Sequence, residues 1–479
     1  MAITLGTIDS TYIRDTASSD GTLEGLYQAL YTYAGDAETY MTKIGSDPYT
    51  YGVVGNRCIR IYGNITIESM DTVEFNKSSN DTQTFRVEEG GALYIEEGVI
   101  IDGYEGAVTG GGRSTFIVNG IIEFQGTVTN PIKVYCCRYL NLFRYGTTNT
   151  DSELTYVEFH LPNYQWNPMF TVYPPRYGSA LAHTFQNVSI YGQTSDQDPK
   201  YTYGLAICGN DNTNITLDNI HIENTYYGMY LYGGVFKMTN STIKNTYGRT
   251  IDSYYGQGGT LDYIANDFST LKDNHKDAYQ PKMKFDTCTF DENYTSSTTR
   301  AFMSGNNFRA YLKNCTFKNA YYGCYASQGS ITVLVGGYGG QTFTNNTYDI
   351  YSSEYDKGMY YGYELNLTVT DTQGNVIENA MVTVAQASNK EMSHFTTDSN
   401  GNIKDLYGDD PVFIERQVYG YSTLTYSMWS DDISSGRYHN ITIMKDGYLP
   451  YNKKVEFTSN QTVIAVLHPI QGIRAIAQG

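Results

Sequence analysis

Acidic residues and a histidine gather in one interruption of the chain, residues 249–284. The candidates for chemistry in this stretch are Asp252, Asp262, Asp267 and His275. Carboxylates and an imidazole are the groups that enzymes most often use as general acids and bases. A stretch rich in Asp and Lys is also typical of a solvated loop. If the chain holds a catalytic site, we expect it here, and solvated loop is the interpretation that we favour.

A second interruption, residues 160–182, contains four prolines and five aromatic residues. Proline removes a backbone donor, so we expect a protruding loop in place of a strand. The side chains that could stack on sugar rings are Tyr164, Trp166, Tyr173, Arg176 and Tyr177. We favour the alternative that these rings pack the loop onto its own chain or onto a neighbouring subunit.

One short segment resembles half of a calcium loop. Asp398-Ser-Asn-Gly-Asn offers oxygen ligands at Asp398 and Asn400 but lacks the remaining positions of such a loop. An Asx turn, in which the aspartate accepts backbone N–H groups, explains the same residues. We therefore predict a turn, with Ca²⁺ as the one cofactor that the sequence suggests.

The elements that must position these groups are short strands repeated between His183 and Ile350. The units read Phe185-Gln-Asn-Val-Ser-Ile, Asp218-Asn-Ile-His-Ile-Glu-Asn, Thr239-Asn-Ser-Thr-Ile-Lys-Asn, Asp286-Thr-Cys-Thr-Phe-Asp-Glu-Asn, Lys313-Asn-Cys-Thr-Phe-Lys-Asn and, more weakly, Gln341-Thr-Phe-Thr-Asn-Asn. Equivalent positions recur after 21 to 27 residues, or 47 where an insertion intervenes. This period is typical of a solenoid, in which stacked coils bury one continuous core.

Alternation along these strands predicts which side chains point inward. The predicted core positions are Val188, Ile190, Ile220, Ile222, Ser241, Ile243, Cys288, Phe290, Cys315 and Phe317. Cys288 and Cys315 occupy equivalent positions, so we predict small buried side chains and no disulfide between them. The seven cysteines of the chain are an odd number without zinc spacing.

The predicted outward column holds little that could do chemistry. Its members are Ser189, His221, Thr242, Thr289 and Thr316. A flanking column alternates in charge, through Glu223, Lys244, Asp291 and Lys318, as cross-strand ion pairs would. We therefore expect His221 to be a surface residue and not a catalytic base, and we favour a protein that is not an enzyme.

Composition changes divide the chain into four parts. Residues 1–52 contain one stretch with apolar side chains at helical spacing, from Leu23 to Ala34, and we predict a helical cap or attachment segment there. Residues 53–360 carry the coils. Residues 364–470 alternate strands with Asp/Gly turns, and residues 471–479 form a tail.

Two resemblances follow from these motifs. The repeat units, together with Gly91-Ala-Leu-Tyr-Ile-Glu-Glu-Gly, resemble the right-handed parallel β-helix superfamily, whose pectin-lyase-like members include lyases, hydrolases, adhesins and viral spikes. Leu365-Asn-Leu-Thr-Val-Thr-Asp-Thr-Gln-Gly and Ile441-Thr-Ile-Met-Lys-Asp-Gly-Tyr-Leu-Pro resemble the carboxypeptidase-regulatory-like, transthyretin-like β-sandwich. The resemblance implies an all-β protein, and it implies that the sandwich is a non-catalytic accessory. The motifs of polygalacturonase-like active sites are not found within the coils.

Charge and composition narrow the partners. A net charge of −18 without any Lys/Arg run argues against nucleic acid and anionic membranes. The 48 tyrosines are typical of a rigid polar β surface, whereas no export signal follows Met1. This combination predicts a virion or extracellular surface, other virion or surface proteins as partners, and possible contact with cell-surface polysaccharide.

The sequence thus favours a virion tail spike, fibre or decoration protein. Viral β-helices are usually homotrimers, so the resemblance implies a trimer. A polysaccharide lyase or glycosidase and a secreted adhesin or surface-layer component are the alternatives.

Overall fold

The computed structural model is all-β in the part of the chain that it describes. The described residues are 2–5, 12–14, 41–44, 57–61, 64–67, 69, 72–74, 82–87, 90–102, 113–118, 120–135, 137–142, 152–161, 168–172, 181–192, 203–207, 213–231, 235–246, 249–253, 282–292, 299–304, 309–326, 331–336, 338–352, 359–386, 392–404, 412–417 and 438–470. Within these ranges one short 3-10 helix, η2 (Tyr338–Gly340), accompanies the strands. The helix predicted between Leu23 and Ala34 lies outside them. No helix of the described residues has the length and apolar character needed to cross a membrane.

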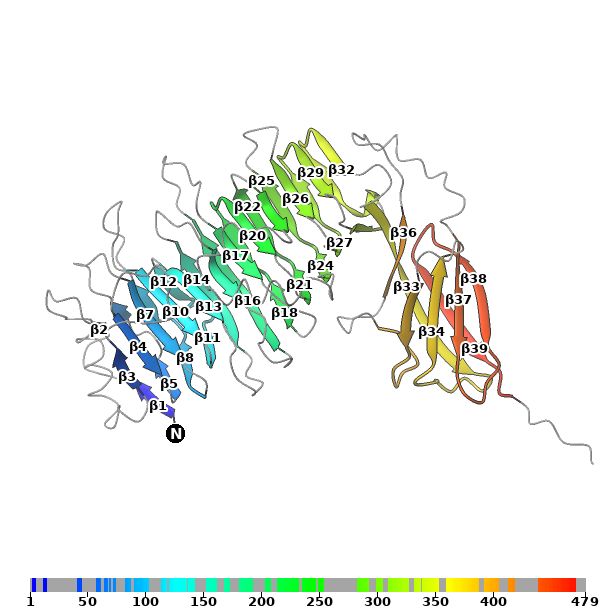
Figure 1. The fold of residues 1–479 in the computed structure, drawn as a ribbon, viewed down its shortest axis with the longest axis horizontal. Helices are drawn as coiled ribbons and strands as arrows, with labels where there is room; N and C mark the ends of the chain where they lie inside the picture. The colour runs from blue at the N-terminus through cyan, green and yellow to red at the C-terminus, as the bar shows by residue number, and fades with distance from the viewer. Residues whose placement is uncertain are drawn as a thin grey trace, which may run out of the picture.

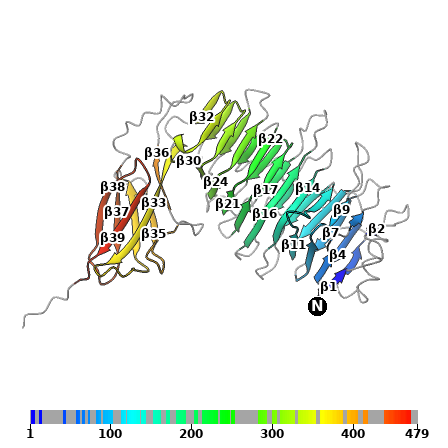
Figure 2. The same cartoon turned by 180° about the vertical axis from the view of Figure 1, so that it is seen from behind.

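Parallel strands stack into three columns, and each turn of the chain adds one rung to each column (Figures 1 and 2). The first column contains β1 (Ala2–Leu5), β5 (Asn64–Ile67), β8 (Ala92–Glu96), β11 (Ile121–Gln125), β14 (Glu153–His160), β16 (Leu181–Tyr191), β18 (Thr213–Asp218), β21 (Val235–Thr239), β24 (Lys282–Asp286), β27 (Arg309–Lys313), β30 (Ile331–Val335) and β33 (Met359–Asp371). The second contains β2 (Tyr12–Arg14), β6 (Thr72–Glu74), β9 (Ile100–Asp102), β12 (Ile132–Tyr135), β19 (His221–Glu223), β22 (Thr242–Thr246), β25 (Thr289–Glu292), β28 (Thr316–Lys318) and β31 (Thr342–Thr344). The long strands β14 and β16 take part in both columns, which joins them, together with β36 (Val412–Gln417) and β39 (Gln461–Leu467), into one 23-stranded sheet.

The third column is a separate 12-stranded sheet. It contains β3 (Met41–Ile44), β4 (Arg57–Ile61), β7 (Thr82–Val87), β10 (Arg113–Val118), β13 (Cys137–Leu142), β15 (Pro168–Val172), β17 (Tyr203–Ile207), β20 (Tyr227–Leu231), β23 (Arg249–Ser253), β26 (Arg300–Ser304), β29 (Tyr322–Ala326) and β32 (Tyr348–Ser352). Its strands are parallel except for the pair β3 and β4. The whole arrangement is consistent with a β-helix-like fold.

The core runs along the inside of the columns. All ten core positions predicted from the alternation are buried. Phenylalanines stack between successive coils: the ring centroids of Phe290 and Phe317 lie 5.4 Å apart, and those of Phe317 and Phe343 lie 5.2 Å apart. Because each coil places like residues over like, the packing of one coil is repeated in the next.

Asparagines at the corners of the coils adopt the left-handed conformation. Positive φ angles occur at Asn187, Asn219, Asn224, Asn240, Asn245, Asn314, Asn319 and Asn345. Asparagine tolerates this region better than other residues that carry a Cβ atom. Its side chain also bridges coils, because Asn219 Nδ2 donates to Asn187 Oδ1 at 2.6 Å. Among the glycines, Gly90 and Gly98 also have positive φ angles.

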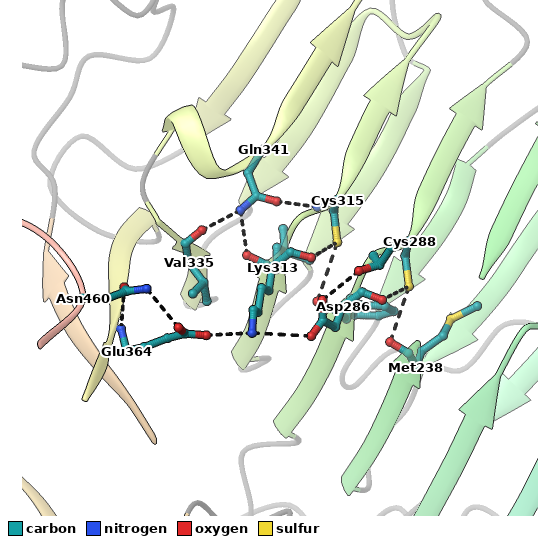
Figure 3. Close-up of polar contacts among 12 residues, drawn as sticks. Met238, Asp286, Cys288, Lys313, Cys315, Val335, Gln341, Glu364 and Asn460 are labelled. Carbon is teal, nitrogen blue, oxygen red and sulfur yellow. Dashed lines mark hydrogen bonds and ion pairs between the residues drawn. The ribbon is translucent and has the colours of Figure 1, made fainter. Parts of the chain in front are cut away.

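A buried glutamine and two cysteines complete the backbone pairing near the end of the columns (Figure 3). Gln341 Oε1 accepts the backbone N–H of Cys315, and Gln341 Nε2 donates to the carbonyls of Leu312 and Val335, each at 2.9 Å. The thiols of Cys288 and Cys315 are free and donate to backbone carbonyls. Burial raises the pKa of the Cys315 thiol well above its ordinary value. The prediction of small buried side chains is confirmed.

The remaining strands form a C-terminal unit beside the last coils (Figure 1). An antiparallel four-stranded sheet has the order β35 (Met392–Thr396), β34 (Met381–Gln386), β37 (Tyr438–Met444) and β38 (Tyr451–Glu456). β36 (Val412–Gln417) and β39 (Gln461–Leu467) pair with β33. Buried side chains of both groups belong to one continuous apolar core.

Strand β33 joins the columns to the C-terminal unit without interruption. Its residues Met359–Gly362 pair with β30 of the last coil, and Leu365–Asp371 pair with β39. Polar side chains hold the same junction (Figure 3). Lys313 Nζ lies 2.7 Å from Glu364 Oε1, and Asn460 Nδ2 donates to Glu364 Oε2 at 2.9 Å. The two parts therefore share a strand and a hydrogen-bonded clamp.

We predict that Thr287→Asn stabilises the protein. Thr287 has a φ of 57° at the corner position where the neighbouring coils have Asn240 and Asn314. A β-branched residue is strained in the left-handed region. Removing this strain is expected to raise the free energy of unfolding by roughly 1 kcal/mol. Thermal unfolding should show a higher Tm than that of the wild type. Thr289→Asn, within the adjacent strand, is the control and should not raise Tm; an equal rise in both variants would contradict the argument.

Candidate functional site

The predicted catalytic residues are not brought together in the part of the chain that the structure describes. Asp252 lies in β23, where it pairs in register with Tyr230 of β20. Asp262, Asp267 and His275 lie outside the described residues. The predicted sugar-stacking residues Tyr164, Trp166, Tyr173, Arg176 and Tyr177 also lie outside them.

Asp398 forms the turn that the sequence predicted. Its Oδ1 accepts the backbone N–H groups of Asn400 and Asn402 at 2.9 and 3.0 Å, and Lys404 Nζ lies 3.4 Å from Oδ2. The hydrogen bond from Asn402, supported by Asn400 and Lys404, lowers the pKa of Asp398. Among the described residues no group of three or more His, Cys, Asp or Glu side chains is arranged to hold a metal ion.

The outward side chains of the second column lie in the predicted register. Ser189, His221, Thr242, Thr289 and Thr316 pair in succession along β16, β19, β22, β25 and β28. The flanking charges pair as expected: Lys244 Nζ lies 3.1 Å from Glu223 Oε2, and Lys318 Nζ lies 2.9 Å from Asp291 Oδ2. Both predictions about this wall are confirmed.

His221 belongs to a ladder of rings that the sequence analysis did not identify. The rings of Tyr135, His160, Tyr191 and His221 follow one another, with centroids 4.7, 5.2 and 5.7 Å apart. His221 Nε2 lies 2.9 Å from Glu223 Oε2. The imidazole is thus held by a carboxylate and a ring, as a structural surface residue is.

Hydrogen bonds lower the pKa of two carboxylates, Asp218 at the end of β18 in the first column and Glu223 in β19 of the second column. Burial raises the pKa of Asp218, but hydrogen bonds from Thr239, Asn240 and Gln186 outweigh this effect and hold its pKa below the ordinary value. Burial also raises the pKa of Glu223, but the contacts with His221 and Lys244 outweigh this effect and lower it. These carboxylates stay charged at neutral pH and act as acceptors between coils.

The most distinctive surface in the described structure is a cluster of tyrosines on the third column. We call it the tyrosine face, and it consists of Tyr227, Tyr230, Arg300, Tyr321, Tyr322, Tyr325, Tyr348 and Tyr351. All of these side chains are half-buried. They come from β20, β26, β29, β32 and the corner before β29. The face has two parts, because β23 and β26 lie between Tyr227 and Tyr230 of β20 and the five tyrosines of the last two coils.

The rings of the tyrosine face stack along the direction in which the coils stack. Tyr325 and Tyr351 lie 5.0 Å apart with an interplanar angle of 14°, and Tyr322 and Tyr348 lie 5.7 Å apart with an angle of 23°. The Arg300 guanidinium lies 4.4 Å over the ring of Tyr325. Because ring faces contact one another, this surface offers ring edges and hydroxyls to a partner and leaves few ring faces for sugar stacking.

The sequence carried a signal for this face. Tyr227-Gly-Met-Tyr-Leu and Tyr322-Gly-Cys-Tyr-Ala are two copies of one pattern, with Tyr at both outward positions. The glycine that follows the first tyrosine of each copy is required, because a Cβ atom there would clash with the backbone of the next coil. A Cβ atom at Gly228 would lie 2.5 Å from the carbonyl oxygen of Thr250, and one at Gly323 would lie 2.7 Å from that of Asp349. The pattern was missed because insertions of different lengths separate its copies.

The environment of Tyr322 suits binding rather than proton transfer. Burial, together with the neighbouring hydroxyls of Tyr351, Tyr321 and Tyr325, raises its pKa, while Arg300 acts in the opposite direction. A phenol with a raised pKa keeps its proton at neutral pH and can donate a hydrogen bond. Tyrosine and arginine are also the residues most enriched in the energetic centres of protein interfaces. The face is therefore suited to bind a macromolecule.

Comparisons with known proteins give no family. No family model matches the chain, and no curated protein matches it either. Among solved structures, a chlorocatechol 1,2-dioxygenase from Pseudomonas putida aligns at 12% identity with a TM-score of 0.15. The alignment covers 23% of this chain and 61% of the dioxygenase, so it spans less than two thirds of that enzyme. A TM-score this low carries no argument about fold or activity.

The hydrogen bonds at Asp218 predict an acid-sensitive contribution to stability. Its folded pKa lies below the ordinary value, so the contribution is present above the ordinary pKa and is lost as the pH falls through the folded pKa. Thermal unfolding between about pH 5 and pH 3 should show a smaller loss of Tm in Asp218→Asn than in the wild type. Glu378→Gln, at an exposed carboxylate, is the control and should follow the wild type. A parallel decline in all three proteins would show that Asp218 contributes nothing.

Proposed function

We propose that this chain is a structural and adhesive surface protein of a prokaryotic virus, such as a tail spike, a fibre or a capsid decoration protein. In this proposal the stacked columns are a right-handed parallel β-helix, and the C-terminal unit is a transthyretin-like β-sandwich. The location is the virion surface or the extracellular space. The partners are other copies of the chain, with a trimer expected by analogy, and other virion or surface proteins or a cell-surface polysaccharide.

The tyrosine face is the observation that carries the proposal. A binding surface gains affinity when its side chains are already ordered, because little conformational entropy is lost on contact. The rings of Tyr322, Tyr325 and Tyr351 contact one another with centroids 4.6 to 5.4 Å apart, and the last two are stacked. Tyr322 and Tyr325 stand on β29, whose backbone pairs with β26 on one side and with β32, the strand of Tyr351, on the other. This is a preorganised surface on a stiff support.

The outer wall of the second column supports the same interpretation. Its ion pairs, asparagine bridges and ring ladder each link one coil to the next. Contacts of this kind stiffen a shaft. On this wall Glu223 and Asp291 are paired with lysines from neighbouring coils, and Glu223 also contacts His221 of its own strand. The wall therefore supports a structural role better than a hydrolytic one.

We predict that truncating the tyrosine face weakens attachment. The double variant Tyr322→Ala/Tyr351→Ala should reduce binding of fluorescently labelled protein to cells of the source culture by about tenfold or more, as loss of an aromatic interface centre does. The matched control is Tyr135→Ala/Tyr191→Ala, which removes two stacked half-buried rings from the other wall. Its binding should stay within about twofold of the wild type. Tm is measured for both variants, so that a loss of fold is recognised.

The location is tested separately. Electron microscopy of the source particles with a labelled antibody to residues 364–470 should show label at regular positions on the virion. Label confined to cell surfaces would favour a secreted adhesin or surface-layer protein. A soluble protein that releases reducing ends from cell-surface polysaccharide would contradict the proposal in favour of a lyase or glycosidase.

A further inference from the structure

The exposed apolar side chains of the described structure are concentrated in the C-terminal unit. Among the described residues outside that unit, Val128 is the one large apolar residue that is exposed. Within it the exposed residues are Val376, Met381, Met444, Leu449, Ile464, Val466 and Ile470. Two of them, Ile464 and Val466, lie at alternate positions on β39. They therefore point to the same side of that strand.

Strand β39 lies at the edge of its sheet in the described structure, since β33 is the strand that pairs with it there. An edge strand offers unpaired backbone N–H and C=O groups, and proteins usually protect such edges with charges, proline or a bulge. β39 reads Gln-Thr-Val-Ile-Ala-Val-Leu from Gln461 to Leu467, without a charge, proline or glycine. Ile464 is 67% exposed and Val466 is 38% exposed.

The other sheet of the same unit has an edge of the opposite kind. β38 carries Lys453, Lys454 and Glu456, all exposed. Lysine on an edge is the commonest device against unwanted pairing. The contrast between β38 and β39 within one small unit indicates that the β39 edge is left open for a partner.

We propose that β39 pairs with β39 of a second copy of this chain, antiparallel and about a two-fold axis. The edge is self-complementary: with Ile464 opposite its symmetry mate, Thr462 lies opposite Val466 of the other copy. All of these side chains remain on one face, as the period of two requires. Each copy has a charge of −18, and an uncharged edge lets two such chains approach without placing like charges in the contact.

A two-fold contact of this kind is isologous, the commonest form of association between identical chains. It would extend the sheet β36, β33 and β39 of one copy directly into that of the other. The inference is independent of the proposed function, because it rests on the edge of the C-terminal unit and not on the tyrosine face. It also differs from the expected trimer, since an antiparallel pair of identical strands cannot close a three-fold ring.

The first test is the mass of the full-length protein in solution, measured by light scattering after size exclusion. The wild type should form an assembly with an even number of copies, and Ile464→Lys should halve its mass, because two like charges would then lie directly opposite each other across the antiparallel pair. Met444→Lys is the matched control, since Met444 is 49% exposed on β37 of the other sheet. It should leave the mass unchanged. A monomeric wild type, or a trimer that Ile464→Lys dissociates, would overturn the proposal.

The second test fixes the register. Under mild oxidation Ile464→Cys should give a covalent dimer, because residues directly opposite in an antiparallel pair have Cα atoms about 4.5 to 5.5 Å apart. Thr462→Cys alone should not, whereas Thr462→Cys combined with Val466→Cys should. The wild type, with Cys288, Cys315 and Cys324 buried, is the blank. Dimers formed equally by Thr462→Cys and Ile464→Cys would contradict the two-fold pairing.

Discussion

The parallel register between coils is the constraint on which this structure depends. Each strand of a column hydrogen-bonds to the strand before and after it, so every residue lies against its own equivalents in the neighbouring coils. The choice of residue at one position therefore acts along a whole column. Phenylalanine stacks on phenylalanine inside, and tyrosine stacks on tyrosine outside.

The same constraint explains the outer wall. A like-charged column would repel itself along its whole length, so charges in register must alternate. Glu223, Lys244, Asp291 and Lys318 do so. The corners follow a related rule, because the chain must turn at the same place in each coil. Asparagine meets this demand with a tolerated positive φ and an amide that reaches the next coil, as Asn345 does toward Asn319.

Much of the second column could be predicted from the sequence, because its strands are close in the chain and alternate regularly. The inward cysteines, the outward threonines and the alternating charges were all read from spacing alone. The tyrosine face was not found. Its strands belong to the third column, where insertions such as residues 254–281 separate one strand from the next. A column can be recognised in a sequence only where its residues recur at a regular spacing. The insertions between Tyr227 and Tyr322 remove that regular spacing.

Strand β33 has a mechanical consequence. Its first residues pair with β30 and its last with β39, and it runs in the direction of the strands, across the stack of coils (Figure 1). A force that pulls the C-terminal unit along β33 therefore acts parallel to the paired strands and loads their hydrogen bonds in shear, all at once. A force along the stack would instead break the same hydrogen bonds one after another, starting from one end of the paired strands. The junction therefore resists a force along β33 better than a force along the stack of coils. The direction in which the C-terminal unit is pulled thus decides how much force the junction withstands.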